Sequence, residues 1–199
     1  MPKVTFSKLF FVDTPEGHLI ALCWGVFIAV WLIAGFFTKP TLERSASTGR
    51  LLLVLAFLAF FAVQFLQLPR LADVVLWPYS QAIGRLADGV AIVGLAVALW
   101  ARFTLGSNWS GRITFKQDHE LVTSGPYAFV RHPIYTGLLL MLLASAIIAG
   151  KTMGFATVAF MTLAMWLKAR EEEKLMLKHF PEAYADYKTR TKALVPFVL

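Results

Sequence analysis

Residues 134–167, IYTGLLLMLLASAIIAGKTMGFATVAFMTLAMWL, decide the fold class of this chain. They contain two apolar runs, at 134–149 and 152–167, which only Gly150 and Lys151 separate. A helix needs about 20 residues, and at least about 17, to cross the hydrocarbon of a bilayer. Each run is close to this minimum, so the pattern predicts two short membrane-spanning helices joined in a tight antiparallel hairpin.

Three further runs, at 17–37, 51–68 and 86–105, are apolar enough to cross a membrane. The composition agrees, because the chain is 58% hydrophobic and only 16% charged, with a mean hydropathy of +0.65. Soluble domains are on average about 45–50% apolar and about a quarter charged. We therefore expect an all-α membrane protein of about five transmembrane helices, with residues 1–199 forming one integral membrane domain. No small-residue cleavage pattern follows the first run, so we expect a retained span and not a signal peptide.

Lysine and arginine predict the orientation of the spans. With five spans, segments 38–50, 102–133 and 168–199 share one side of the membrane and carry three, four and seven basic residues, against five on the other side. Cytosolic loops carry such an excess. We expect the C-terminus in the cytosol, and we attribute the net charge of +7 to these loops and not to nucleic-acid binding.

Several classes of site are not supported by the sequence. The single cysteine, Cys23, lies within an apolar run and excludes an intramolecular disulfide. His119, His132 and His179 do not have the spacing of zinc ligands, so we expect no metal site. The chain has no Gly-x-Gly-x-x-Gly after a strand, which argues against a dinucleotide-binding domain.

Polar residues gather on the predicted cytosolic side of the hairpin. Pro133 suits the first turn of the fourth helix, where free N–H groups and the helix dipole favour an anion, and Arg131 would strengthen this field. Glu171, Glu172 and Glu173 follow the fifth helix. Because the two helices form a hairpin, these groups must lie close together, and they could hold a zwitterion such as an amino-acid moiety by both ends. Taken singly, each feature is also typical of an ordinary membrane boundary.

An amphipathic helix is predicted after the fifth span. Met176, Phe180, either Ala183 or Tyr184, and Tyr187 recur at spacings of three and four residues. Pro181 suits the first turn of a second helix. We expect this tail to pack against the membrane surface or the ends of the spans.

The order of these motifs resembles the isoprenylcysteine carboxyl methyltransferase family, which is related to the phospholipid methyltransferases. The resemblance rests on HELVTSGPYAFVRHPIYTG at 119–137, the hairpin, the pair Glu172-Glu173 and FPEAYADY at 180–187. It covers about half of the chain, from residue 105 onward. It implies that residues 105–199 form the catalytic half, that the first three spans lie in 1–104, and that the cofactor is S-adenosylmethionine. The cofactor pocket would be built from the hairpin, the loop before it and the C-terminal helix.

Site residues are carried over from the family's motifs by position. The cofactor-binding candidates are His119, Leu121, Val122, Tyr127, Arg131, His132, Pro133, Tyr135, Glu172 and Glu173. The family's acceptor-holding arginine falls on Lys168, and Arg170 and Trp109 are further substrate candidates. A lysine cannot hold a carboxylate with two parallel hydrogen bonds as an arginine does. We nominate no proton-transfer residue.

The resemblance thus predicts an integral membrane methyltransferase whose acceptor is a lipid or a prenylated small molecule. Carboxyl methylation of a prenylcysteine and N-methylation of an ethanolamine lipid both stay open. A membrane reductase of the sterol-reductase type, using NADPH, is a further alternative, and so is a small scaffold or transporter subunit. The sequence does not indicate an oligomeric state.

Overall fold

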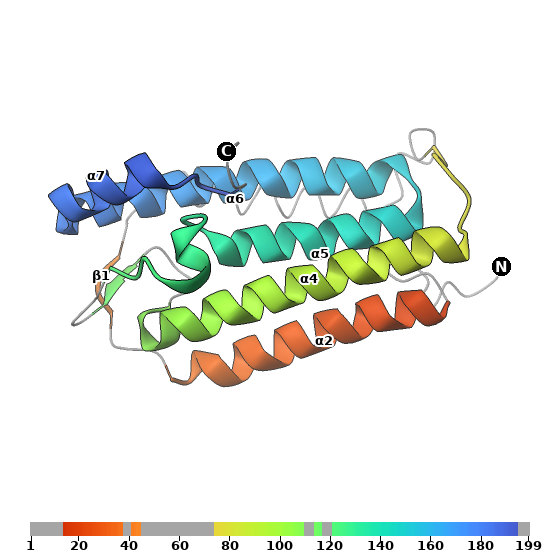
Figure 1. Ribbon diagram of the computed structural model, residues 1–199, viewed down its shortest axis with the longest axis horizontal. Helices are drawn as coiled ribbons and strands as arrows, with labels where there is room; N and C mark the ends of the chain where they lie inside the picture. Colours follow the sequence, from red (N-terminus) through yellow and green to blue (C-terminus); the bar gives the residue numbers. More distant parts are fainter. Residues whose placement is uncertain (1–13, 38–40, 45–73, 110–113, 117–120, 195–199) are drawn as a thin grey trace.

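A computed structural model describes residues 14–37, 41–44, 74–109, 114–116 and 121–194, the short segments 41–44 and 114–116 by their backbone only. Within these residues, four long helices run side by side (Figure 1). They are α2 (Pro15–Gly35), α4 (Gln81–Leu105), α5 (Pro133–Ala149) and α6 (Thr152–His179). A shorter helix, α7 (Pro181–Arg190), lies beside the end of α6, and the one-turn helices η1 (Gly106–Asn108) and η2 (Gly125–Ala128) lie in the segment between α4 and α5.

Three described helices are long and apolar enough to cross a membrane: Pro15–Gly35, Gln81–Asn108 and Thr152–His179. Helix α5 is apolar as well but has only 17 residues. The all-α, multi-pass membrane architecture expected from the sequence is therefore confirmed. The predicted span at 51–68 lies outside the described residues, so the count of five spans stays a prediction.

Two short strands add to the predicted helices. Strand β1 (Thr41–Arg44) pairs antiparallel with β2 (Thr114–Lys116) beyond the end of the bundle where α2 ends (Figure 1). Each strand has four residues or fewer, which is too short for an alternation of apolar and polar residues to predict it. Their pairing joins segments about 70 positions apart, which a local pattern does not reveal.

Helices α4 and α5 approach each other unusually closely. The face of α4 toward its neighbours consists of small residues at spacings of three and four: Gly84, Ala87, Ala91, Gly94, Ala98 and Ala101. A Cβ atom added at Gly137 of α5 would lie 2.5 Å from the backbone oxygen of Gly94. In a membrane, such small residues let helix backbones approach and gain van der Waals contact. On the other side of α4, the large residues Ile20 and Phe27 of α2 are buried in the same core.

The turn between α5 and α6 is as tight as the sequence predicts. Gly150 ends α5 with φ +61°, a left-handed conformation that favours glycine. The segment before α4 closes over this turn, since the backbone N–H of Leu76 donates to the carbonyl of Gly150 at 2.8 Å and the indole N–H of Trp77 donates to the carbonyl of Ile147 at 3.0 Å. The hairpin is thereby held at the end of the molecule opposite α7.

Helix α6 is longer than the span predicted within it. We expected a span at 152–167 followed by a separate tail helix, but one helix runs unbroken to His179. Residues 168–178 contain no glycine or proline to interrupt it, and α7 then begins at Pro181 as predicted. At about 1.5 Å per residue the 28 residues measure about 42 Å, more than the roughly 30 Å of membrane hydrocarbon. The last turns of α6 therefore extend past the apolar layer.

Candidate functional site

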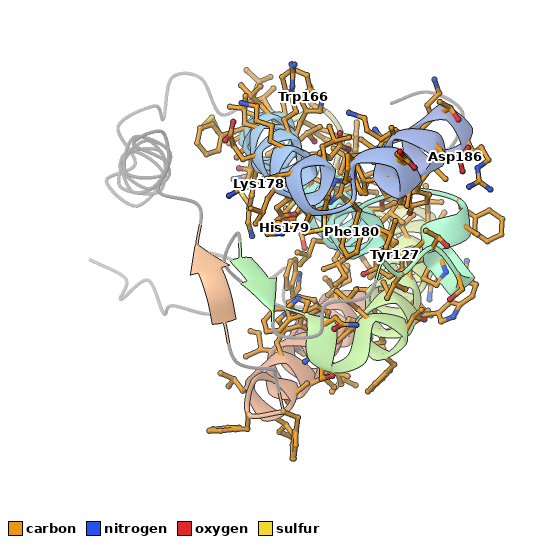
Figure 2. All side chains as sticks on the ribbon, turned by 90° about the vertical axis from the view of Figure 1, so that its left-hand side faces the viewer. Tyr127, Trp166, Lys178, His179, Phe180 and Asp186 are labelled. Atoms are coloured by element: carbon orange, nitrogen blue, oxygen red, sulfur yellow. The ribbon has the colours of Figure 1, made fainter. Side chains whose placement is uncertain are left out.

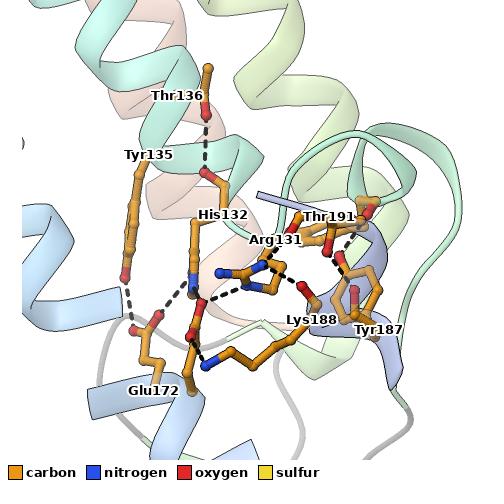
Figure 3. A network of polar contacts seen from close by, with 10 residues as sticks. Arg131, His132, Tyr135, Thr136, Glu172, Tyr187, Lys188 and Thr191 are labelled. Carbon is orange, nitrogen blue, oxygen red and sulfur yellow. Dashed lines mark hydrogen bonds and ion pairs between the residues drawn. The ribbon is translucent and has the colours of Figure 1, made fainter. Parts of the chain in front are cut away.

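The start of α5 and the end of α6 meet as predicted, and Glu172 lies at the centre of the contact. The hydroxyl of Tyr135 donates to Glu172 Oε1 at 2.7 Å. His132 Nδ1 lies 3.5 Å from Glu172 Oε2, and Lys168 Nζ lies 3.7 Å from Oε1. The rings of His132 and Tyr135 are stacked, with centroids 5.4 Å apart (Figure 3). One carboxylate is thus bounded by an imidazole, a phenol and an ammonium group.

The neighbouring Glu173 belongs to a different set of contacts. Its Oε1 accepts a hydrogen bond from Arg131 Nε at 2.6 Å, and its Oε2 lies 2.9 Å from Lys188 Nζ of α7. His132 lies between the two carboxylates, since its Nε2 is 3.4 Å from Glu173 Oε1. The side chain of Glu173 is 8% exposed, whereas that of Glu172 is 22% exposed. The more accessible carboxylate is therefore Glu172.

Arg131 ties the start of α5 to the C-terminal segment. Besides Glu173, its guanidinium donates to the backbone carbonyls of Thr191 and Lys188. The backbone N–H groups of Arg131 and His132 donate to the carbonyls of Lys192 and Ala193, at 2.8 and 3.0 Å. From the sequence we expected free N–H groups here to form an anion site. The structure differs, because carbonyls of the chain itself accept hydrogen bonds from these two N–H groups. Figure 3 shows Arg131, Lys188 and Thr191 on the opposite side of His132 from Tyr135 and Glu172.

The Gly-Pro-Tyr sequence at 125–127 forms the one-turn helix η2, which is held in place by contacts on two sides. Tyr127 is buried, and its hydroxyl donates to the carbonyl of Ala101 in α4 at 3.4 Å. Its own carbonyl accepts from the hydroxyl of Tyr187 in α7 at 2.6 Å. Seen from this end of the bundle, Tyr127 lies inside the molecule, whereas Trp166 and Asp186 lie at its edges (Figure 2). Helix α7 therefore holds the turn against the end of α4.

An apolar cluster connects this turn to the membrane helices. Ala101, Tyr127 and Ile134 form its buried centre. The partly buried residues around it are Trp31, Leu105, Trp109, Val122, Tyr135 and Leu138. Since Tyr135 also contacts Glu172, the cluster places an apolar, aromatic surface directly beside the polar group. A site of this kind can hold a polar group at one end and an apolar chain at the other.

Burial and charge act in opposite directions on His132. Burial disfavours the imidazolium, but the carboxylates of Glu172 and Glu173 outweigh this effect and raise the pKa of His132 above its ordinary value of 6.5. In α7, burial raises the pKa of the Tyr187 hydroxyl to about 12. Tyr187 is thus a neutral hydrogen-bond donor to the turn, and His132 is stabilised as a cation between two carboxylates.

Most of the candidates from the sequence come together here, and some do not. Seven belong to the contacts described above: Tyr127, Arg131, His132, Tyr135, Lys168, Glu172 and Glu173. Pro133 begins α5 directly after His132, and Val122 and Trp109 line the apolar cluster. Arg170 instead lies 4.8 Å from the ring of Trp166 and is exposed on another face of α6. Leu121 is half-buried and takes no part in the contacts of Glu172 described above. His119 lies outside the described residues.

Three residues of this network were not among the candidates: Tyr187, Lys188 and Thr191. Each acts from α7 or just after it, and each contacts a candidate residue or its backbone. Tyr187 was noted for its amphipathic spacing and as the last residue of the FPEAYADY motif, without a role in the site. The spacing and the motif predict that a helix packs on the site, but they do not indicate which polar groups it provides.

The residues fit the amino-acid part of S-adenosylmethionine, the cofactor that the resemblance implies. Nε2 of His132 is buried and makes no hydrogen bond within the described part of the chain, since its approach to Glu173 lacks the required direction. As an imidazolium, this ring still carries an N–H that can donate to a further acceptor such as a ligand carboxylate. Glu172 offers a partly exposed carboxylate for an ammonium group, close to this donor.

Comparison with known proteins gives a consistent result. The family model described as the isoprenylcysteine carboxyl methyltransferase (ICMT) family matches residues 87–178. The protein-S-isoprenylcysteine O-methyltransferase of Mus musculus is 32% identical over 130 residues, which are 62% of this chain and 46% of the mouse protein. The cobalt-zinc-cadmium resistance protein CzcN of Cupriavidus metallidurans is 34% identical over 123 residues, which are 60% of this chain and 50% of that protein. The chain thus spans about half the length of each of these two relatives.

A solved structure is similar in fold. It is described as the eukaryotic intramembrane Ras methyltransferase ICMT (isoprenylcysteine carboxyl methyltransferase) without a monobody, and it matches with a TM-score of 0.56. The match covers 96% of this chain and 71% of that chain, at 20% sequence identity. The helical arrangement is therefore shared well beyond the residues that align by sequence.

Proposed function

Because the chain belongs to the isoprenylcysteine carboxyl methyltransferase family, we propose that it transfers a methyl group from S-adenosylmethionine to a lipophilic acceptor in the membrane. Members of this family use S-adenosylmethionine. The observation that supports this function best is the position of Glu172, between Tyr135, His132 and Lys168 and beside an apolar cluster. This arrangement suits a reaction between a polar cofactor and an apolar acceptor.

The contacts of Glu172 suggest how the cofactor is held. When bound, the cofactor supplies a methyl group on a positively charged sulfur, which needs little further activation. Glu172 would accept hydrogen bonds from its ammonium group, and Tyr135 and His132 orient that carboxylate. Imidazolium on His132 and ammonium on Lys168 would balance the carboxylate charges of the protein and the ligand. Glu173, which Arg131 and Lys188 neutralise, would support the position of His132 without touching the ligand.

Orientation and exclusion of water are the main catalytic contributions that this site can make. The turn at Tyr127, fastened to both α4 and α7, would close the site on its cytosolic side. The apolar cluster would align the acceptor with the methyl group. Fixing two reactants in line can contribute several kcal/mol, roughly 7–11 in the best intramolecular cases. No proton-transfer residue is required when the acceptor is a carboxylate.

Lys168 favours a carboxylate acceptor over an amine. Its Nζ lies 3.7 Å from Glu172 and 5.3 Å from the centre of the Tyr135 ring, at the border between polar group and apolar cluster. A lysine ammonium attracts a carboxylate and repels the ammonium headgroup of an ethanolamine lipid. We therefore place carboxyl methylation of a prenylcysteine-like compound first, and N-methylation of an ethanolamine lipid second. The catalytic half is residues 105–199 in this proposal.

Binding of S-adenosylhomocysteine to the purified protein in detergent tests the cofactor site. Calorimetry should give a measurable affinity for the wild type and at least a hundredfold loss for Glu172→Gln. Glu171→Gln is the matched control, because Glu171 is the adjacent residue and pairs only with Lys174 at the surface in the described structure. Equal affinities of the two variants would refute the role of Glu172. A melting temperature raised by NADPH and not by S-adenosylhomocysteine would instead support the reductase alternative.

The acceptor is tested with cofactor that carries a labelled methyl group. The substrates compared are S-farnesylcysteine and phosphatidylethanolamine, each in mixed micelles with the purified protein. Base-labile label in the farnesylcysteine fraction is expected, because a methyl ester hydrolyses in base and an N-methyl group does not. Label only in phosphatidylethanolamine would overturn the carboxylate assignment while leaving methyl transfer intact.

A further inference from the structure

A pocket of about 300 Å³ opens between η2 and the end of α7, apart from Glu172. It is lined by Ala128, Phe129, Arg131, Lys188, Thr189, Arg190, Thr191 and Lys192. Arg131 and Lys188 pair with Glu173, and Figure 3 shows both of them beyond His132 from Glu172. The methyl-transfer site proposed above does not use this pocket.

Positive charge exceeds negative charge in this pocket. Four of its lining residues are cations: Arg131, Lys188, Arg190 and Lys192. The carboxylate of Glu173 neutralises part of the charge of the first two, and Asp186 pairs with Arg190. Within the described residues no carboxylate pairs with Lys192. Since only two carboxylates in the part of the chain that the structure describes pair with these four cations, net positive charge remains in the pocket. It therefore suits an anion with more than one acceptor oxygen.

The pocket lies at the boundary of the membrane. Helix α5, which is apolar throughout, begins at Pro133, only two residues after Arg131. Phe129, which lines the pocket, is 61% exposed, and aromatic side chains are enriched at the level of lipid headgroups. A basic pocket beside an exposed phenyl ring therefore presents charge to a headgroup and an apolar ring to the start of the acyl chains.

We propose that this pocket binds the phosphate group of an anionic membrane lipid. A phosphate diester offers two strong acceptor oxygens, which match the excess of donors on Arg190 and Lys192. The charge distribution along the chain predicts that this end faces the cytosol, where the leaflet is negatively charged and attracts basic segments close to the surface. A bound lipid would bridge η2, which contains Tyr127, and the residues that follow α7, which hold Arg131 in place. The lipid would thereby stabilise the cytosolic end of the enzyme without taking part in methyl transfer.

Titration with short-chain lipids tests the proposal on the purified full chain in detergent. The probe is dioctanoyl-phosphatidylglycerol, and its affinity is derived from the rise in melting temperature with concentration. Dioctanoyl-phosphatidylcholine has the same acyl chains without net charge, and inorganic phosphate has the charge without the chains. The anionic lipid is expected to bind at least tenfold more tightly than either.

Substitutions assign the binding to the pocket. Lys192→Gln is expected to weaken binding of the anionic lipid about fivefold, because one cation close to an anionic surface contributes about 1 kcal/mol. The double variant with Arg190→Gln is expected to weaken this binding about 25-fold. Lys174→Gln, which removes an exposed cation of α6 outside the pocket, should change the affinity by less than about twofold. Phe129→Ser should weaken binding of the lipid and leave the affinity for inorganic phosphate unchanged. S-adenosylhomocysteine should bind all four variants as it binds the wild type.

Each of the other outcomes overturns the proposal. An unchanged affinity in the double variant would show that the lipid binds elsewhere. Equal binding of phosphatidylcholine would show that charge is not recognised. Binding of inorganic phosphate as tightly as the lipid would identify a site for free phosphate instead of a headgroup.

Discussion

Replacing Glu173 by glutamine should destabilise the protein more than replacing either neighbouring glutamate. Glu173 accepts a 2.6 Å hydrogen bond from Arg131 Nε and lies 2.9 Å from Lys188 Nζ, so it joins α6 to the start of α5 and to α7. Its side chain is 8% exposed and that of Arg131 is 11% exposed. Removing one partner of such a buried ion pair costs about 3–5 kcal/mol, because the other charge remains buried without compensation.

The individual contacts refine this magnitude. The side chain of Lys188 is 37% exposed, so its pairing with Glu173 adds no more than about 1 kcal/mol. A glutamine retains the shape and one acceptor oxygen, and Arg131 keeps its backbone carbonyl partners. We therefore expect Glu173→Gln to lower the free energy of unfolding by about 3 kcal/mol. At roughly 2–4 °C per kcal/mol for a chain of this size, the melting temperature should fall by about 6–12 °C.

The assay is the thermal unfolding of the purified protein in detergent, measured beside Glu171→Gln. Glu171 pairs with Lys174, whose side chain is 70% exposed, so this variant should lose less than about 1 kcal/mol. A double-mutant cycle with Arg131→Gln should give a coupling of at least about 1.5 kcal/mol between the two residues in contact. If Glu173→Gln melts within about 2 °C of Glu171→Gln, or if the coupling is near zero, the ion pair of Arg131 and Glu173 does not join the helices.

Two further predictions concern helix packing and pH. Gly137→Ala should destabilise the protein by roughly 3 kcal/mol, because the new methyl group would lie 2.5 Å from the carbonyl oxygen of Gly94. Gly89→Ala should be neutral or stabilising by about 0.5 kcal/mol, since nothing lies within 4 Å of its Cβ position. Equal melting temperatures for these two variants would contradict the close approach of α4 and α5. Because the pKa of His132 is raised in the folded protein, its contribution to stability is full below its ordinary value of 6.5 and is lost as pH rises through the raised value. Melting temperatures measured from pH 5.5 upward should therefore show the wild type losing its advantage over His132→Gln, and a constant difference would refute this linkage.

The sequence was sufficient to predict the hairpin of α5 and α6 and the position of its polar end. Two apolar runs separated by Gly150 and Lys151 leave no other antiparallel solution in a membrane, since a lipid-exposed backbone must bond within its own helix. From this connectivity it follows that residues 131–135 lie close to residues 168–173, as the structure confirms. The start of α7 at Pro181 was predictable from the same local chemistry, because proline fits the first turn of a helix.

The length of α6 was not predicted correctly, because hydropathy marks where a helix leaves the apolar layer and not where it ends. Lys168 and the glutamates after it stop the apolar run, yet each is an adequate helix former. The pairing of β1 with β2 joins distant segments of four and three residues, too short to have a periodic signature. The small-residue face of α4 is visible in the sequence, but only its partner Gly137 shows that the face is used for close packing.

Hydropathy and spacing by themselves determined that the chain crosses a membrane, that α5 and α6 form a hairpin, and that a polar group stands at its end. Only the tertiary structure decided how the adjacent Glu172 and Glu173 divide their roles. Successive residues of a helix point about 100° apart, so Glu172 faces Tyr135 and the apolar cluster while Glu173 faces Arg131 and Lys188. Helix α7 and the carbonyls of residues 191–193 cover the side of the site that Glu173 faces. This leaves Glu172 as the carboxylate that a ligand can reach. No local pattern in the sequence contains that information, because the contacts join residues about 60 positions apart.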